Sequence, residues 1–188
     1  MGHRNREIEV KLLVPGSFEF VCGELDGLLE AEKPIIRIGS SVDTYWNVPN
    51  GEAQFLRVRE RDGIRQITVK GKDRGDNVNR IEVDIDSTSE THRIHRLIRC
   101  VLGKPHGTVA KQYRVWELES EYDTVCAYVV STPKNSLGTV VEVEARTEER
   151  MRELEKLVSK HFNKSGFDVT PAPGSLFEML VKPEHLPL

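Results

Sequence analysis

Apolar and polar residues alternate with a period of two along most of the chain, which predicts β-strands. In the run 7–11, charged residues alternate with Ile8 and Val10. The same rhythm recurs in 56–59, 80–85 and 141–145, and further strands are expected at 35–46, 64–70, 109–118 and 125–130. The pattern therefore predicts about eight strands, with Asp62-Gly63 as the turn of one hairpin.

Helical periodicity interrupts the strands at 17–29, 87–102 and 147–162, and a short helix is expected at 175–181. Ser87 followed by Glu90 has the spacing of a capping box. Thr147 precedes Glu148 and Glu149, which places a cap and two acids at the positive end of a helix. The sequence therefore predicts an α+β protein in which helices flank a mainly antiparallel sheet.

Length and composition limit the function classes. The chain has 188 residues and no composition break, so we expect one domain spanning 1–188. A net charge of −3 gives no global positive field, which argues against nucleic acid as a partner. The first twenty residues are charged where a signal peptide would be apolar, and no segment approaches the roughly 20 apolar residues of a membrane span. We expect a cytoplasmic protein with no membrane partner.

Its three cysteines, Cys22, Cys100 and Cys126, are expected to be buried thiols.

The strands carry apolar residues on one face and dense charges of both signs on the other. One interpretation is an open sheet with a solvated face and cross-strand ion pairs. The alternative is a sheet that closes into a barrel whose charged face lines an inner cavity. Such a cavity would suit a polyanion together with metal ions.

Two pairs of glutamates alternate on strands near opposite ends of the chain. Glu7 and Glu9 lie on one strand face, as do Glu142 and Glu144. Neighbouring carboxylates repel one another, and a hard divalent cation such as Mg²⁺ or Mn²⁺ relieves that repulsion. Either pair alone is more often a solvated face, but together they indicate a metal site.

Basic residues recur on strands that are far apart in the sequence. The set comprises Lys11, Arg57, Arg59, Lys70, Arg80 and Lys111. Arginine offers paired donors to phosphate oxygens and lysine a compact charge, so these residues together could neutralise a chain of three phosphates. A small molecule that contains a triphosphate is the expected partner.

These motifs resemble the CYTH superfamily, also called triphosphate tunnel metalloenzymes. The string EIEVK at 7–11 is similar to the Glu-x-Glu-x-Lys signature near the N-terminus of that family. Further matches in the family's order are Asp43-Thr44-Tyr45, Leu56-Arg57-Val58-Arg59, Thr68-Val69-Lys70-Gly71, Arg80-Ile81-Glu82, Lys111 ahead of Val115-Trp116-Glu117-Leu118, Asp123-Thr124-Val125, Leu137-Gly138 before Glu142-Val143-Glu144, and 175–180. The resemblance spans nearly the whole chain.

The resemblance implies an eight-stranded antiparallel β-barrel, the triphosphate tunnel, flanked by helices. It implies that acids bind Mg²⁺ or Mn²⁺, and by position these are Glu7, Glu9, Asp123, Glu142 and Glu144. Lys11, Arg57, Arg59, Lys70, Arg80 and Lys111 would contact phosphates, and Glu82 would support Arg80 or a metal-bound water. Lys11, Glu9 and Glu144 are the expected catalytic residues, with Lys11 orienting the water or the leaving oxygen.

The chain departs from the family's pattern at two positions. Many members have an arginine where this chain has Tyr113, and Arg114 follows it. Alternation places Arg114 with Trp116 on the apolar face, so Arg114 is only a further candidate for substrate binding. Vertebrate-type thiamine triphosphatases have a lysine where this chain has Ser175, which argues against thiamine triphosphate as the substrate.

The expected activity is metal-dependent hydrolysis of inorganic triphosphate, or of a nucleoside or thiamine triphosphate. A class IV adenylate cyclase needs nearly the same lining, because there the ribose 3′ hydroxyl of ATP attacks the α phosphorus in place of water. A third hypothesis is a tunnel that binds nucleotide or polyphosphate without turnover.

Overall fold

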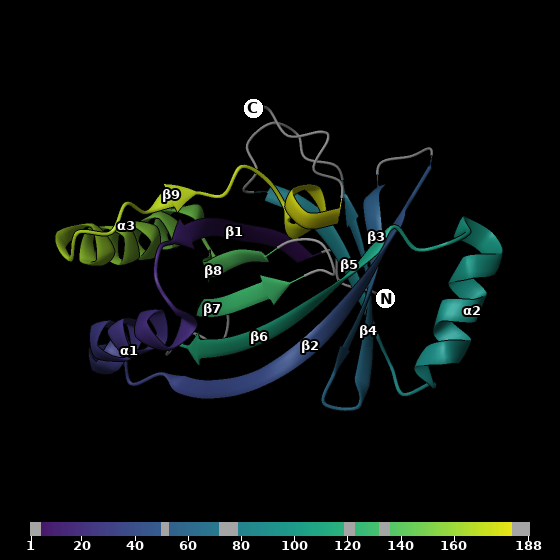
Figure 1. Ribbon diagram of the computed structural model, residues 1–188, viewed down its shortest axis with the longest axis horizontal. Helices are drawn as coiled ribbons and strands as arrows, with labels where there is room; N and C mark the ends of the chain where they lie inside the picture. The colour runs from purple at the N-terminus through teal and green to yellow at the C-terminus, as the bar shows by residue number, and fades with distance from the viewer. Residues whose placement is uncertain (1–4, 50–52, 72–78, 119–122, 132–135, 182–188) are drawn as a thin grey trace.

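The computed structural model describes residues 5–49, 53–71, 79–118, 123–131 and 136–181, without the side chains of 5–7, 79–82, 131, 136–137, 177 and 181. The fold is α+β and is built on one antiparallel sheet (Figure 1). Its strands are β1 (Asn5–Val14), β2 (Ile35–Asn47), β3 (Ala53–Arg61), β4 (Ile64–Gly71), β5 (Asn79–Ser87), β6 (Gly107–Glu117), β7 (Thr124–Ser131), β8 (Ser136–Glu144) and β9 (Thr170–Pro171).

The sheet curls so that its two sides meet at β1. The strand order is β5-β4-β3-β2-β6-β7-β8-β1-β9, and β1 also pairs with β5. The segment from Glu9 to Val14 pairs with β8, whereas the segment from Asn5 to Ile8 pairs with β5. The seam with β5 is short, with four residue pairs. The predicted eight-stranded tunnel is confirmed, and the two-residue strand β9 is an addition.

Within the described residues, three α-helices flank the sheet: α1 (Phe18–Leu29), α2 (Thr91–Leu102) and α3 (Glu148–Lys164), with a 3-10 turn η1 (Glu30–Glu32) after α1. The predicted cap of α3 is confirmed, because the Thr147 hydroxyl accepts a hydrogen bond from Arg150 N at 3.2 Å. The predicted capping box at Ser87 is wrong. Ser87 is the last residue of β5 and pairs with Arg65, so α2 begins only after Glu90.

The helices cover two separate parts of the outer face of the sheet. Figure 1 shows α1 and α3 together at one end and α2 at the other. Under α1 and α3, Leu12, Val125 and Val143 pack against Leu25 and other helix residues. Under α2, Trp46 and Val58 pack against Ile94 and Ile98. These strand residues alternate with the charged ones, so burial of the apolar face directs the charged face inward.

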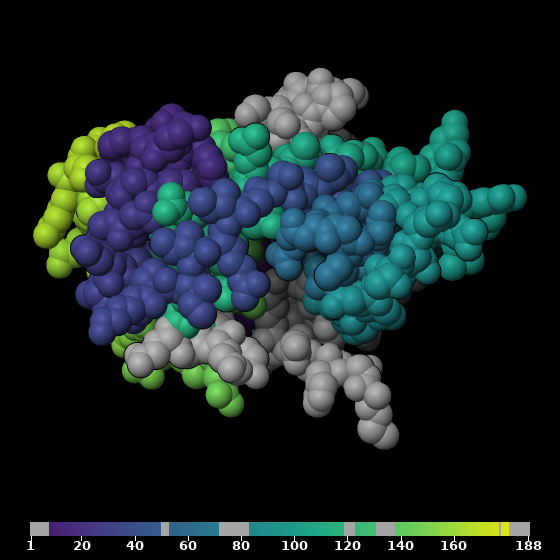
Figure 2. All heavy atoms as spheres, turned by 90° about the horizontal axis from the view of Figure 1, so that it is seen from below, coloured from purple at the N-terminus to yellow at the C-terminus, as the bar shows by residue number. Residues whose placement is uncertain are grey.

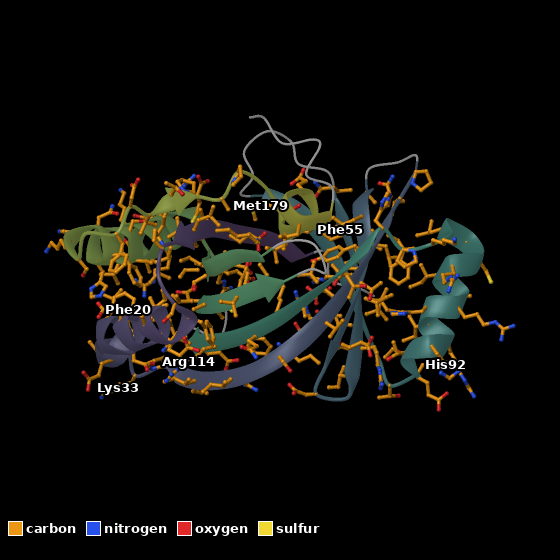
Figure 3. The ribbon with its side chains drawn as sticks, viewed as in Figure 1. Phe20, Lys33, Phe55, His92, Arg114 and Met179 are labelled. Carbon is orange, nitrogen blue, oxygen red and sulfur yellow. The ribbon has the colours of Figure 1, made fainter. Side chains whose placement is uncertain are left out.

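A short π-helix, η2 (Phe177–Val181), closes one end of the tunnel. Its residues Met179 and Leu180 pack among inner-face residues that include Tyr45 and Phe55, and Figure 3 shows Met179 beside Phe55. Glu178 accepts a hydrogen bond from Gln54 Nε2 at 2.6 Å. The helix expected at 175–181 is therefore present, and it lies at the end of the tunnel where β3 begins.

The hairpin between β3 and β4 forms the opposite end of the tunnel. Its turn residues Asp62 and Gly63 have φ angles of 52° and 77°. Two successive positive φ values are typical of a type I′ turn, which the Asp-Gly pair predicts.

The cysteines differ from the expectation at one position. Cys22 is buried and Cys126 is partly buried, but Cys100 is exposed on α2. No helix in the described ranges is both long and apolar enough to cross a membrane.

Candidate functional site

Charged residues lie buried on the inner face of the tunnel. The exposed fraction is 0% for Asp43, 4% for Glu9, 5% for Lys70 and 8% for Lys111. A solvated sheet face would leave these side chains in water, so the charged face lines an inner cavity, as the second interpretation predicts. Burying charge is costly unless each group is paired, and these groups form two connected clusters.

The first cluster lies where β1 meets β8. Lys11 Nζ lies 2.5 Å from Glu9 Oε1 and 3.1 Å from Glu142 Oε2. Lys70 reaches the same Glu9 oxygen from β4 at 3.1 Å. The register places Glu9 opposite Glu144 and Lys11 opposite Glu142, so three carboxylates share one patch of the inner face around one lysine of these two strands.

The second cluster surrounds Asp43 on β2. Arg59 donates two hydrogen bonds to its carboxylate, at 2.8 and 3.0 Å, and Lys111 Nζ lies 3.1 Å from Oδ2. Burial opposes ionisation of Asp43, but the two cations outweigh it, and its pKa lies well below the usual value. Burial lowers the pKa of Lys111 to about 8, although Asp43 acts in the opposite direction. Asp43 thus anchors two buried cations.

Tyr128 connects the two clusters. Its hydroxyl donates to Glu142 Oε2 at 3.0 Å, and Lys111 Nζ lies 5.0 Å from the centre of its ring. Burial and then Glu142 raise the pKa of Tyr128 well above its usual value, so the hydroxyl keeps its proton. The network therefore runs from the β1–β8 carboxylates to the cations of β3 and β6.

Arg57 has a different type of partner. Its Nη2 donates to the Thr68 hydroxyl at 2.9 Å, and Thr68 in turn donates to Asp84 Oδ1 at 2.5 Å. Arg57 contributes to the electrostatic environment of Asp43 and Lys111, which places it near the second cluster.

Two predicted site residues lie elsewhere. Arg114 faces outward, where its Nη2 lies 2.8 Å from Asp26 of α1, and Figure 3 shows it beside that helix. Strand β6 has no bulge between Lys111 and Arg114, so the odd spacing puts them on opposite faces. Asp123 binds the backbone N–H of Arg146 and the Arg150 guanidinium of α3, at 3.2 and 3.3 Å. Neither residue joins the inner clusters.

Three predicted residues are described only by their backbone. Glu7 pairs with Arg80 across the β1–β5 seam, and Glu82 pairs with both Asn5 and Lys70. Their side chains lie outside the described part of the chain.

The sequence interpretation assigned no role to Asp43, Tyr128 or Thr68. Asp43 was noted only within the family-like string Asp43-Thr44-Tyr45. A usable signal exists in the alternation Ser41, Asp43, Tyr45, which puts a carboxylate on the face opposite Trp46.

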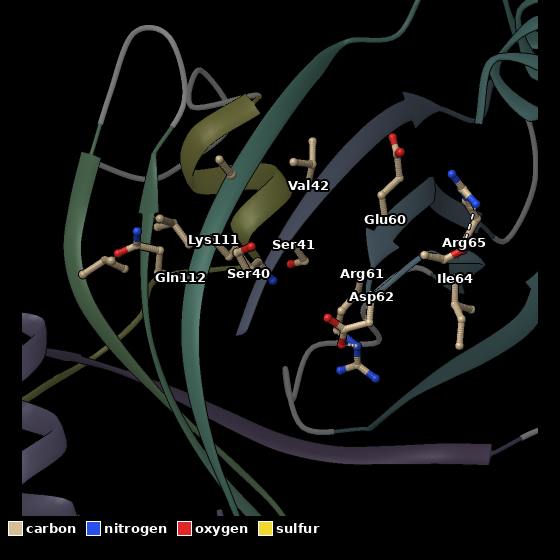
Figure 4. Close-up of a pocket in the computed structure, with 14 residues that line it drawn as sticks. Ser40, Ser41, Val42, Glu60, Arg61, Asp62, Ile64, Arg65, Lys111 and Gln112 are labelled. Carbon is tan, nitrogen blue, oxygen red and sulfur yellow. Dashed lines mark hydrogen bonds and ion pairs between the residues drawn. The ribbon is translucent and has the colours of Figure 1, made fainter. Parts of the chain in front are cut away.

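A pocket of about 740 Å³ lies beside the β3–β4 hairpin (Figure 4). It is lined by Ser40 and Val42 of β2 and by Ala110 and Gln112 of β6, which alternate with the buried inner-face residues, so the pocket lies on the outer face of the sheet. Figure 2 shows this side of the molecule, where the surface is hollowed between the dark-blue residues of β2 and the steel-blue residues of β3 and β4. Of the predicted site residues whose side chains the structure describes, only Lys111 lines this pocket, so the pocket lies apart from the two clusters.

The donor chemistry fits a hard divalent cation. Glu9, Glu142 and Glu144 offer only carboxylate oxygens, the ligands that Mg²⁺ and Mn²⁺ prefer. As the described side chains stand, no three His, Cys, Asp or Glu residues form a group that could hold a metal ion. Lys11 lies between Glu9 and Glu142 and neutralises them instead. A cation at this place would therefore compete with Lys11 for the carboxylates.

Solved structures share this architecture. PH1012 protein from Pyrococcus horikoshii OT3 is 21% identical, with a TM-score of 0.62, over 86% of this chain and 94% of that one. A candidate adenylate cyclase from Bacillus halodurans is 16% identical, with a TM-score of 0.61, over 95% and 98% of the two chains. HpAC1 from Hippeastrum, an adenylyl cyclase candidate with a dominant triphosphatase activity, is 16% identical, with a TM-score of 0.61, over 97% of each chain.

These similarities establish the fold. Neither the family models nor the curated proteins compared with the sequence give a match. The protein shares the fold of these structures, an antiparallel sheet curled into a tunnel and flanked by helices.

Proposed function

We propose that the protein is a divalent-metal-dependent triphosphatase that hydrolyses a triphosphate inside the tunnel. The observation that carries this proposal is the division of buried charge between two connected clusters. Buried ion pairs contribute little to folding stability, because desolvation offsets most of the attraction. Their concentration on one concave face is typical of a site that exchanges its internal partners for a charged ligand.

The cations of β3 and β6 are the proposed phosphate ligands. Arg57, Arg59 and Lys111 lie on adjoining parts of the inner face, and they are charged groups with donors suited to phosphate oxygens. Lys70 and Arg80 remain proposed contacts from β4 and β5. Neutralising the triphosphate lowers the cost of the negative charge that builds up as the terminal phosphoryl group leaves.

The carboxylates of β1 and β8 are the proposed metal ligands. Glu9, Glu142 and Glu144 would hold Mg²⁺ or Mn²⁺, and Glu7 stays a proposed ligand two residues along β1. Such an ion supplies charge neutralisation on the phosphate oxygens and polarises a bound water. With an ion held by these carboxylates, Lys11 could orient the attacking water or the leaving oxygen.

The deciding experiment is a parallel assay of phosphate release from tripolyphosphate, ATP and thiamine triphosphate, with cyclic AMP measured in the ATP reaction. We expect metal-dependent release of phosphate and no cyclic AMP. Cyclic AMP with pyrophosphate would make the protein a cyclase instead. Tight binding of all three compounds without any product would make it a binding protein. A Glu142→Gln, Glu144→Gln double variant purified in the same way controls for contaminating phosphatases.

A further inference from the structure

Glu144, one of the proposed metal ligands, is the last residue of β8. On one side of the strand the pairing continues past it, because Ala145 N donates to the Ile8 carbonyl of β1 at 3.1 Å. On the other side, the pair of Thr124 with Glu144 is the last one with β7. Strand ends open more easily than strand interiors. The position of Glu144 therefore depends on what holds the chain directly after it.

Asp123 holds this part of the chain from the β7 side. Its Oδ1 accepts a hydrogen bond from Arg146 N at 3.2 Å. Its own carbonyl accepts from Leu118 N at 2.9 Å, which ties Asp123 to the end of β6. Because Asp123 directly precedes Thr124, its side chain extends the contact between β7 and β8 beyond their last residue pair.

The second oxygen of Asp123 binds α3. Arg150 Nε donates to Oδ2 at 3.3 Å, and Arg150 Nη2 lies 3.5 Å from Glu32 of η1. The Asp123 side chain is only 8% exposed, so water competes little for these bonds. Donors from two elements thus fix the carboxylate at the junction of β6, β8 and α3.

A metal site depends on supports of this kind. Its ligands must be held within about 0.5 Å of the productive geometry. Removing a residue that orients a ligand typically weakens metal binding by about 10- to 100-fold. Glu144 precedes Arg146 by two residues, so a shift of the Arg146 backbone would change where the Glu144 carboxylate lies relative to Glu9 and Glu142.

We propose that Asp123 is a positioning residue that sets the Glu144 carboxylate for a divalent cation by holding the Arg146 N–H. This inference rests on the proposed function, because it takes Glu144 as a metal ligand. It gives Asp123 a role different from the direct metal contact that the family resemblance implies.

The test measures binding of Mn²⁺ alone by isothermal titration calorimetry, so the readout does not depend on turnover. Asp123→Ala removes the acceptor of the Arg146 N–H, and the dissociation constant for Mn²⁺ should rise at least about tenfold. Asp123→Asn loses the charge but keeps an oxygen that accepts from Arg146. Its dissociation constant should stay within about threefold of the parent value, below the effect of a lost support.

Thr147→Ala is the matched control. It removes the hydroxyl that caps the same end of α3 and leaves the bond between Asp123 and Arg146 in place. Mn²⁺ binding should keep its parent value, and circular dichroism and thermal unfolding show whether each variant folds. Where Asp123→Ala does not fold, Arg146→Pro replaces it, because proline lacks the N–H while Asp123 keeps Arg150. This variant should weaken Mn²⁺ binding to the same extent.

The possible failures are distinguishable. Parent affinity for Mn²⁺ in a folded Asp123→Ala would overturn the positioning role and leave the metal site standing. A loss in Asp123→Asn as large as in Glu144→Gln would mean that Asp123 contacts the ion, and would also overturn it. An equal loss in Thr147→Ala would assign the effect to loosening of the helix end. Absence of Mn²⁺ binding by the unsubstituted protein would refute the proposed metal site and this inference with it.

Discussion

The two clusters inside the tunnel have opposite charge balance and the same construction. On β1 and β8, Glu9, Glu142 and Glu144 surround Lys11. On β2, β3 and β6, the cations Arg57, Arg59 and Lys111 lie around Asp43. Each cluster thus combines three like charges with side chains of the opposite sign, which are Lys11 and Lys70 at the carboxylates and Asp43 at the cations.

The difference between the two central residues is informative. Asp43 is fully buried and forms short contacts with two cations, so it is a fixed part of the wall. Lys11 bridges two carboxylates and retains more exposure, so it is the counter-ion that an incoming cation could replace. The cationic cluster is therefore suited to a polyanion, and the acidic cluster to a metal ion.

The largest expected effect is on the acidic cluster. In the Glu142→Gln, Glu144→Gln double variant, we expect turnover to fall by at least about 10³-fold, or about 4 kcal/mol, because amides supply too little charge to hold the ion. The measurement is phosphate release over a range of Mg²⁺ and Mn²⁺ concentrations. Glu117→Gln, which breaks a surface ion pair with Arg37, should keep full activity. Unchanged activity of a folded double variant at low metal would exclude these residues from the metal site.

The next effect concerns the centre of the cationic cluster. Asp43→Asn leaves Arg59 and Lys111 buried without their counter-ion, so we expect the free energy of unfolding to fall by about 3 kcal/mol. Urea denaturation measures this loss. The same change at the more exposed Asp26, which pairs with Arg114, should cost no more than about 1 kcal/mol. Equal losses in the two variants would show that burial of Asp43 has no special energetic role.

The two arginines of β3 should respond more moderately. Arg57→Lys and Arg59→Lys each keep the charge but lose the planar fork, so substrate binding should weaken by about 1 to 3 kcal/mol. Steady-state kinetics separates an effect on KM from an effect on kcat. A rise in KM alone means equal contact in ground and transition states, and a fall in kcat means a contact that tightens on developing charge. If both constants stay at the parent values in both variants, neither arginine touches the substrate.

The smallest expected effect is the pH dependence of Lys111. Its pKa of about 8 means that its charge is lost as the pH rises through 8, in surroundings that include Asp43, Arg59, Arg57, Glu142 and Tyr128. KM should therefore rise less than tenfold between pH 7.5 and 9.5, and Lys111→Arg should flatten that rise because arginine stays charged. A rise of the same size and midpoint in Lys111→Arg would assign the titration to another group.

The same pKa predicts the sign of a stability effect. Between pH 8 and the ordinary lysine pKa of 10.5, the unfolded chain binds more protons than the folded protein. The contribution of Lys111 therefore makes the free energy of unfolding increase with pH in this window. Below pH 8, this contribution does not depend on pH.

Alternation along the strands predicts which face a side chain occupies. It places Lys11, Arg57, Arg59 and Lys111 inside and Arg114 outside, because a side chain's face depends only on its position within its own strand. It cannot predict which charges become neighbours, since that depends on the order and register of strands that are distant in sequence. Asp43 shows this limit, because its partners come from β3 and β6.

Strand ends are harder to predict than strand interiors. Asp123 matches a motif of the family but lies at the start of β7, where it binds Arg150 of α3. Ser87 matches a capping motif, but its pairing with Arg65 in the sheet keeps it out of the helix. In both cases a tertiary contact decides the role of the residue against the local pattern.

The η2 plug limits how a long polymer could be processed. With Met179 and Leu180 packed among the inner-face residues where β3 begins, a polyphosphate strand cannot thread through the tunnel from end to end. Only its terminus could reach Arg59 and Lys111 from the side of the Asp62-Gly63 turn, and the released fragment would leave by the same path. Cleavage of such a polymer would be restricted to bonds near its ends, and bonds in its middle would be spared.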